Sequence, residues 1–170
     1  MKAVVVDTNV PMTANEADGD LACILACVEK LIEVLKNGVV SIDDHDLIMR
    51  EYRRNLGLSR RPPIRTGDAF MIWMHDHEWD CERCERVAVT PKAHDPEDFE
   101  EIPADPHFAG FDRSDRKFLA VAIASRVRPT ILNATDSDWW HYRVALAKHG
   151  IEVNNLCPGI SARSRASHPK

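Results

Sequence analysis

The sequence predicts one α/β domain, built as a three-layer α/β/α sandwich around a mainly parallel central sheet. Short apolar runs typical of strands alternate along the chain with longer amphipathic segments typical of helices. The first run, residues 3–6, contains no polar side chain, as expected for a strand that is buried on both faces of a parallel sheet. We expect the domain to span residues 1–157, with an acidic insertion of little regular structure at about 91–110 and a disordered tail at 158–170.

The remaining elements follow from the spacing of the apolar residues. Residues 20–38 place leucine, isoleucine and valine at helical spacing and end at Gly38, where a left-handed residue is favoured. Residues 43–57 predict a helix opened by Asp43 or Asp44. Further helices are expected at 67–79, 112–126 and about 139–149, and further strands at 39–43, 85–91, within 129–138 and at 151–156.

The composition is that of an ordinary globular protein, with 44% hydrophobic and 29% charged residues in a chain of 170. No apolar run approaches the roughly 20 residues that span a membrane, and the first run ends at Asp7, too early for a signal peptide. We therefore expect a cytoplasmic protein without a membrane partner. The five cysteines are an odd number and widely spread, which predicts reduced thiols rather than a disulfide framework.

The charges are separated along the chain. The net charge of −5 argues against a protein that coats nucleic acid by charge alone. However, residues 49–65 carry six arginines, whereas the charged residues of the segment 94–115 are almost all acidic. This separation suits an enzyme that holds a phosphodiester with its basic segment and a metal ion with its acids.

Several carboxylates are expected to converge. Asp7 and Asp136 each follow an apolar strand, and the carboxyl ends of parallel strands meet at the edge where α/β proteins bind ligands. Asp115 lies in the first turn of a predicted helix, Glu51 borders the apolar face of another, and Asp138 follows Asp136 by two residues. Gathered carboxylates repel one another unless a cation neutralises them, and oxygen ligands without histidine or cysteine suit Mg²⁺ or Mn²⁺. The alternative for Asp7 is that it only caps a turn or helix.

Four motifs in order resemble those of the PIN domain family. They are Asp-Thr-Asn after the first strand, the Glu-Tyr of "IMREY", "DRKFLAVA" with its helix-starting aspartate, and Thr-Asp-x-Asp-Trp at residues 135–139. The resemblance extends from about Lys2 to Leu156. It implies the three-layer fold and a metal-dependent endoribonuclease that cleaves single-stranded or structured RNA through metal-activated water. Many bacterial members are toxins of toxin–antitoxin pairs, so an antitoxin or other regulatory protein and a homodimer are further implied partners.

The resemblance also assigns residues. The acidic quartet of the family falls on Asp7, Glu51, Asp115 and Asp136, with Asp138 as an accessory metal ligand, Thr8 and Asn9 as polar neighbours at the substrate, and one or two Mg²⁺ or Mn²⁺ ions. Asp112 is an alternative to Asp115 as the third acid. From the basic segment, Arg53 and Arg54 are candidates for binding substrate phosphates, against the simpler interpretation of a solvated helix face.

A second motif and two other functions compete with this interpretation. His75, His77, Cys81 and Cys84 lie within ten residues and could hold a structural zinc ion, although such sites usually pair two ligand segments, so we favour plain helix and turn. We interpret Cys23, Cys27 and the tryptophans at 139–140 as core residues. The chain could be a catalytically weak RNA- or protein-binding module of the same fold. It could also be a phosphatase of another α/β fold with a nucleophilic Asp7. Such phosphatases usually have a second aspartate two residues later, and Asn9 at that position argues against this alternative.

Overall fold

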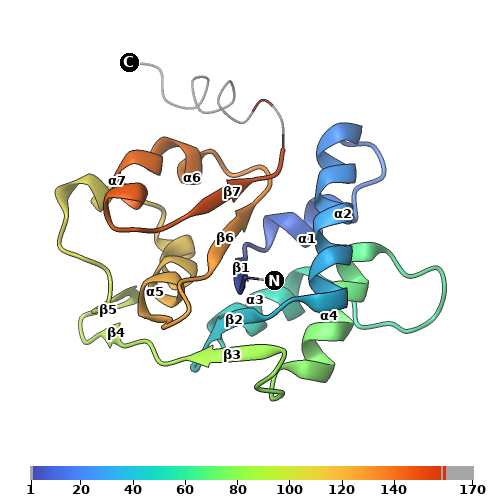
Figure 1. Cartoon of the computed structure of the whole chain (residues 1–170), viewed down its shortest axis with the longest axis horizontal. Helices are drawn as coiled ribbons and strands as arrows, with labels where there is room; N and C mark the ends of the chain where they lie inside the picture. Colours follow the sequence, from blue (N-terminus) through green and yellow to red (C-terminus); the bar gives the residue numbers. More distant parts are fainter. Residues whose placement is uncertain (1, 158, 160–170) are drawn as a thin grey trace.

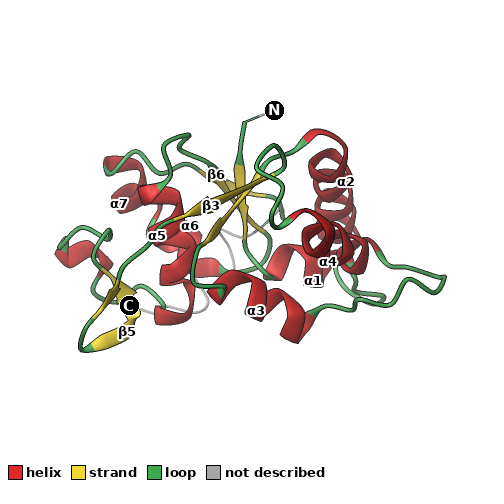
Figure 2. Ribbon diagram, turned by 90° about the horizontal axis from the view of Figure 1, so that it is seen from below, coloured by secondary structure: helices red, strands yellow, loops and turns green. Residues whose placement is uncertain are grey.

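The structure is a computed structural model that describes residues 2–157 and residue 159. Its centre is a five-stranded, all-parallel sheet in the order β3-β2-β1-β6-β7, which confirms the predicted α/β class (Figure 1). The strands are β1 (Val4–Val6), β2 (Val40–Asp43), β3 (Cys84–Val87), β6 (Thr130–Asn133) and β7 (Val153–Asn155). Helices α1, α2 and α4 lie on one side of the sheet and α5, α6 and α7 on the other, which gives the three layers (Figures 1 and 2).

The order in which the strands are added to the sheet changes direction beside β1. From β1 the chain proceeds through β2 to β3, and it then returns to the other side of β1 to form β6 and β7. Val4 pairs with Val40 on one side and with Thr130 on the other, so β1 is the central strand. Its side chains are almost fully buried, as the apolar run predicted. The gap between the ends of β1 and β6 is therefore the topological switch point of the sheet, where ligands bind in folds of this kind.

The helices follow the predicted periodicities with local differences. They are α1 (Asn9–Ala14), α2 (Leu21–Asn37), α3 (Leu47–Asn55), α4 (Thr66–His77), α5 (Arg116–Ala124), α6 (Ser137–His141) and α7 (Arg143–Lys148). The short helix α1 was not predicted. The expected helix over 139–149 is interrupted at Tyr142 and forms α6 and α7. The prediction of a left-handed Gly38 is wrong, because its φ is −82° and the chain leaves α2 directly in extended conformation.

The acidic insertion is more ordered than expected. Residues 91–110 form the antiparallel hairpin of β4 (Pro91–Lys92) and β5 (Asp95–Phe99), followed by a 3₁₀ turn at Pro106–Phe108. Phe99 and Phe108 are buried, and Arg116 forms a 2.6 Å ion pair with Asp98 in which both side chains are largely buried. The acidic composition predicted little regular structure because composition alone does not reveal that a few buried side chains and one buried ion pair fix the segment.

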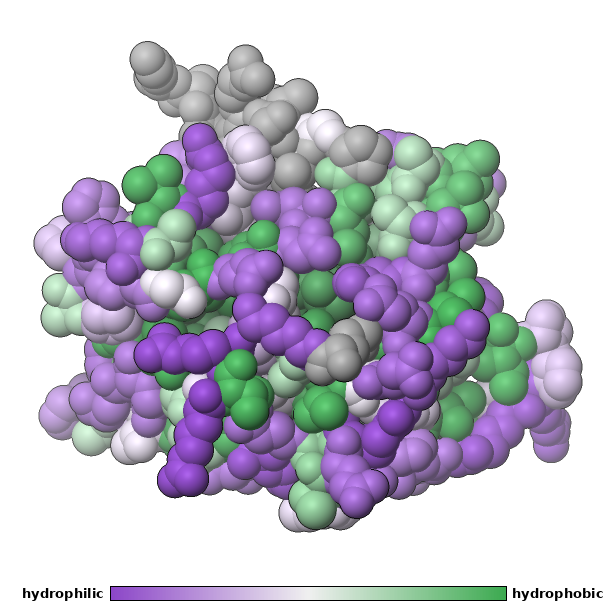
Figure 3. Space-filling model, viewed as in Figure 1, coloured by the Kyte–Doolittle hydropathy of each residue, from purple (hydrophilic) through white to green (hydrophobic). Residues whose placement is uncertain are grey.

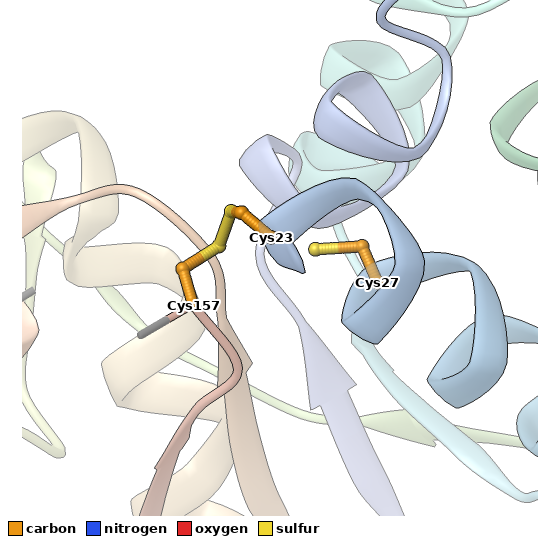
Figure 4. Close-up of side chains that lie close together, drawn as sticks. All are labelled: Cys23, Cys27 and Cys157. Carbon is orange, nitrogen blue, oxygen red and sulfur yellow. A yellow bond between two sulfur atoms is a disulfide. The ribbon is translucent and has the colours of Figure 1, made fainter. Parts of the chain in front are cut away.

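The cysteines contradict the prediction of reduced thiols at two positions. Cys23, in the first turn of α2, forms a disulfide with Cys157, just after β7, across 134 residues of sequence, and Cys27 lies beside the pair (Figure 4). Cys27, Cys81 and Cys84 are free thiols. Spacing along the chain could not reveal the pairing, because it depends on β7 ending next to the start of α2.

Two further predictions concern the ends of the chain and membranes. The expected disordered tail at 158–170 lies, apart from residue 159, outside the described residues. Among the residues that the structure describes, no helix has the length and apolar character needed to cross a membrane.

Candidate metal centre

Three of the predicted acids meet at the switch point of the sheet. Asp7 follows β1, Asp136 caps the amino end of α6 shortly after β6, and Asp115 immediately precedes α5. Each contributes a carboxylate oxygen to a group in which all such atoms lie within 4.8 Å of one another. The three residues come from separate segments, and only the parallel arrangement of β1 and β6 and the entry of α5 bring them together.

Asp7 is the most tightly held of the three. It is 4% exposed; its Oδ1 accepts a hydrogen bond from the amide of Asn9 at 3.0 Å and its Oδ2 accepts one from Nε1 of Trp139 at 2.7 Å. Burial raises its pKa to about 7, an effect that these two hydrogen bonds reduce and that the charges of Asp136 and Glu51 increase. Asp7 thus accepts a hydrogen bond from the first residue of α1 and also faces the other two acids.

A hydrogen bond links the carboxyl groups of Asp115 and Asp136. Burial, followed by the charge of Asp7 and a hydrogen bond from one carboxyl group to the other, raises the pKa of Asp115 to about 9. The charge of Asp112 contributes to the same effect. Asp136 itself is oriented by its Oδ1, which accepts a hydrogen bond from the amide of Asp138 at 2.8 Å. Without a cation the group therefore retains protons near neutral pH, which is the expected response of crowded carboxylates.

An asparagine network supports the acids. The side chain of Asn9 donates to Oδ1 of Asn133 at 2.9 Å and accepts from the amide of Ala134 at 2.8 Å. Asn133 in turn donates to the main-chain oxygen of Asp136 and to the side chain of Asn155. Asn9, predicted as a substrate neighbour, therefore positions the loop that carries Asp136. Asn133 and Asn155 were missed, although asparagines ending two adjacent strands were a usable signal.

The fourth predicted acid stands apart from this group. Oε2 of Glu51 forms a 2.6 Å ion pair with Nζ of Lys117, which also donates to the main-chain oxygen of Ser114. Within the described residues the 4.8 Å group contains neither Glu51 nor Asp138, although the charge of Glu51 still raises the pKa of Asp7. The role of Lys117 was not predicted, since a lysine in the first turn of a helix gives no indication of its partner.

The alternative third acid has a structural role. Asp112 accepts hydrogen bonds from the amide and the hydroxyl of Ser114 and so caps the 3₁₀ turn (Arg113–Asp115) that leads into α5. The structure therefore places Asp115, and not Asp112, with Asp7 and Asp136.

The residues predicted to contact substrate have different surroundings in the structure. Thr8 is buried, and its hydroxyl has no hydrogen-bond partner among the described residues. Arg53 is committed elsewhere, because it pairs with Asp46 at 3.1 Å and with both carboxylate oxygens of Glu78 at 2.9 Å. Its proposed contact with substrate is therefore disfavoured. Arg54, its neighbour on α3, is exposed.

The alternative zinc motif is not assembled in the described part of the chain. No group of three metal-ligating atoms there includes His75, His77, Cys81 or Cys84. Cys84 is buried within β3, whereas Cys81 is exposed, and Nδ1 of His77 bonds the main-chain oxygen of Trp73. Helix and strand, not metal binding, explain the positions of these residues.

The three grouped acids fit a divalent cation with oxygen ligands. No salt bridge reaches Asp7, Asp115 or Asp136 from any described lysine or arginine, so their charge is not neutralised by the protein. Burying such a group without a partner is costly, and a hard cation removes the cost. The absence of histidine and cysteine from this group favours Mg²⁺ or Mn²⁺ over zinc.

Comparison with known proteins adds no further assignment. No family model, curated protein or solved structure matches the chain. The geometry of the centre and the motifs in the sequence are therefore the two indications of a function.

Proposed function

We propose that the chain is a metal-dependent endoribonuclease of PIN type. One observation carries the proposal: the carboxylates of Asp7, Asp115 and Asp136 converge within 4.8 Å at the topological switch point of a parallel sheet. The buried Thr8 hydroxyl, which is next to Asp7 and has no hydrogen-bond partner among the described residues, is a further polar group at this edge.

The chain's own residues would perform distinct tasks. Asp7, Asp115 and Asp136 would hold Mg²⁺ or Mn²⁺, and such an ion lowers the pKa of a bound water and stabilises the developing phosphoryl charge. Trp139 and the amide of Asn9 fix the orientation of both oxygens of Asp7. Because these positions are set before substrate arrives, little reorganisation is needed during the reaction.

The test is RNA cleavage with a matched pair of variants. We expect the purified protein to cut RNA with Mn²⁺ and to stop when EDTA is added. Asp115→Asn should lose at least a hundredfold in rate, because it removes a ligand of the group. Asp112→Asn, three residues away, should cleave normally, since asparagine caps the Ser114 turn as well as aspartate does. Cleavage in EDTA, or full activity of Asp115→Asn, would refute the proposal.

One observation favours a second candidate. The ion pair with Lys117 withdraws Glu51 from the predicted quartet, and a PIN-like module with an incomplete metal site would bind RNA or protein without cutting. The phosphatase alternative is weaker, because both oxygens of Asp7 already accept hydrogen bonds and are poorly placed to act as a nucleophile.

Location and protein partners stay predictions. The exposed residues Leu21, Leu25 and Ile32 lie on one side of α2, and the surface in Figure 3 shows hydrophobic patches on the side where α2 runs. A homodimer or an antitoxin would need an apolar surface of this kind. A cytoplasmic location accords with the free thiols but not with the disulfide, which is rare in reducing compartments.

A further inference from the structure

A pocket of about 270 Å³ opens beside the candidate metal centre. Its walls come from α3, from β5 of the acidic insertion and from the segment 113–117 that leads into α5. Glu51 and Ser114, which line it, adjoin the centre: Ser114 precedes Asp115, and the charge of Glu51 acts on Asp7. A ligand in this pocket would therefore lie next to the three grouped acids.

Ion pairs decide which cations of the pocket are available to a ligand. Lys117 is neutralised by Glu51, and Arg113 by Asp95 and Glu97. The other two cations are Arg50 and Arg54, four residues apart and hence on one face of α3.

These two arginines lack a carboxylate partner among the described residues. Arg50 donates only to the main-chain oxygens of His45 and Asp46. Arg54 is exposed and forms no hydrogen bond or ion pair within the described part of the chain. Because the acids of the pocket are already paired, its free charge is positive, and the complementary ligand is an anion.

Apolar side chains complete the lining of the pocket. They are Leu47, which lies on α3 with the arginines, and Pro96 and Phe99 of β5. Pro96 is exposed and Leu47 is partly exposed, whereas Phe99 is buried. The volume of the pocket lies just below the usual range for small-ligand pockets, about 300–1,000 Å³, which suits a single nucleotide better than a helical duplex. Unstacked bases of single strands are commonly held against such apolar and aromatic surfaces, while phosphates are held by arginine.

We propose that this pocket binds one nucleotide of single-stranded RNA next to the bond that is cut. Arg54 and Arg50 bind the phosphate, and Leu47 and Pro96 contact the base. The inference rests on the proposed ribonuclease function for its choice of RNA, but it assigns a site that the metal-binding residues do not define. It also gives the acidic insertion a task, since β5 supplies the wall that closes the pocket.

The test measures binding without cleavage. A 5′-labelled, eight-nucleotide single-stranded RNA of mixed sequence is titrated in EDTA and followed by fluorescence anisotropy. Arg54→Ala should weaken binding about tenfold and lower the slope of log K against log salt by about 0.7, the value for one lost phosphate contact on a single strand. A duplex of the same sequence should bind at least tenfold more weakly than the single strand.

Arg126→Ala is the matched control. Arg126 is also exposed, but it follows the carboxyl end of α5, whereas the amino end of that helix adjoins the centre. We expect it to change affinity by less than twofold. Equal losses in the two variants, no loss in Arg54→Ala, or preference for the duplex would each overturn the proposal.

The outcome is separable from that of the nuclease test. Cleavage with Mn²⁺ combined with an unaffected Arg54→Ala would leave the proposed function standing and refute the pocket. Binding that depends on Arg54 without any cleavage would do the reverse. Because Arg54 is exposed and unpaired, its substitution does not threaten the fold.

Discussion

The substitution Asp115→Asn is expected to stabilise the metal-free protein at neutral and alkaline pH. The variant removes one negative charge from the group formed with Asp7 and Asp136. An asparagine amide can still donate a hydrogen bond to Asp136, replacing the one between the carboxyl groups. The expected gain therefore comes from relief of burial and repulsion rather than from a change in hydrogen bonding.

The magnitude follows from proton linkage. The pKa of Asp115 is about 9 in the folded chain, against 3.8 ordinarily, so the folded state keeps a proton that the unfolded state loses. The contribution of Asp115 to the free energy of unfolding is then highest below about pH 4 and falls by about 1.4 kcal/mol per pH unit as the pH rises toward 9. Between pH 4 and 7 this loss of stability amounts to about 4 kcal/mol. The value is an upper limit, because neighbouring acids share the proton with Asp115. At about 3 °C per kcal/mol, that corresponds to roughly 10 °C in Tm.

Thermal melts of both proteins at pH 5 and pH 8 test this reasoning. In EDTA, the Tm of the wild type should be lower at pH 8 than at pH 5, and the decrease should be much smaller in Asp115→Asn. The decrease that remains in the variant comes from Asp7, whose pKa is about 7. Mn²⁺ at about 100 times its dissociation constant should stabilise the wild type by roughly 2.7 kcal/mol and the variant by little. The same pH dependence in both proteins, or equal shifts with Mn²⁺, would refute the assignment of Asp115 to the centre.

Three further predictions concern ion pairs and the disulfide. Arg53→Ala should lower the free energy of unfolding by about 2 kcal/mol in urea, because the buried carboxylate of Glu78 loses both hydrogen bonds from the guanidinium and keeps only His75 at 4.0 Å. RNA affinity should not change; weakened RNA binding at full stability would contradict this. Lys117→Met should remove the ion pair of Glu51 and make this carboxylate available as a metal ligand. Calorimetric titration should then show two Mn²⁺ per chain in the variant and one in the wild type; equal stoichiometry would contradict this role of Glu51. Cys157→Ser should cost about 5 kcal/mol, the chain-entropy value for a closed loop of this length, and a reductant should lower the Tm of the wild type only.

The sheet and two of the acids could be predicted because they depend on local pattern and a general rule. A run of buried β-branched residues predicts a strand wherever it occurs, and the carboxyl ends of parallel strands share an edge, which brings Asp7 and Asp136 together. The short helix α1 escaped notice, since six residues are too few to show a helical period and Pro11 interrupts the pattern.

The features that were missed depend on contacts between distant segments. Glu51 lies on the expected side of α3, but its partner Lys117 comes from α5, and only the packing of these helices sets their distance. The Cys23–Cys157 disulfide likewise joins segments 134 residues apart. Arg53 and Arg54 are equivalent in the sequence, yet the helix turns one toward Glu78 and the other toward the pocket.

The double role of Asp7 explains why the centre is part of the fold and not an addition to it. Its two oxygens hold the start of α1 and the indole of Trp139 on α6, so the residue links the two layers across the end of β1. Asparagine at this position would keep only one acceptor oxygen, leaving one buried donor unpaired at a cost of about 1–3 kcal/mol. That loss opposes the gain from reduced repulsion, so Asp7→Asn would change stability and metal binding together. In the part of the chain that the structure describes, no main-chain amide donates to the carboxylate of Asp115. For this reason its substitution separates the chemistry of the centre from the stability of the sheet.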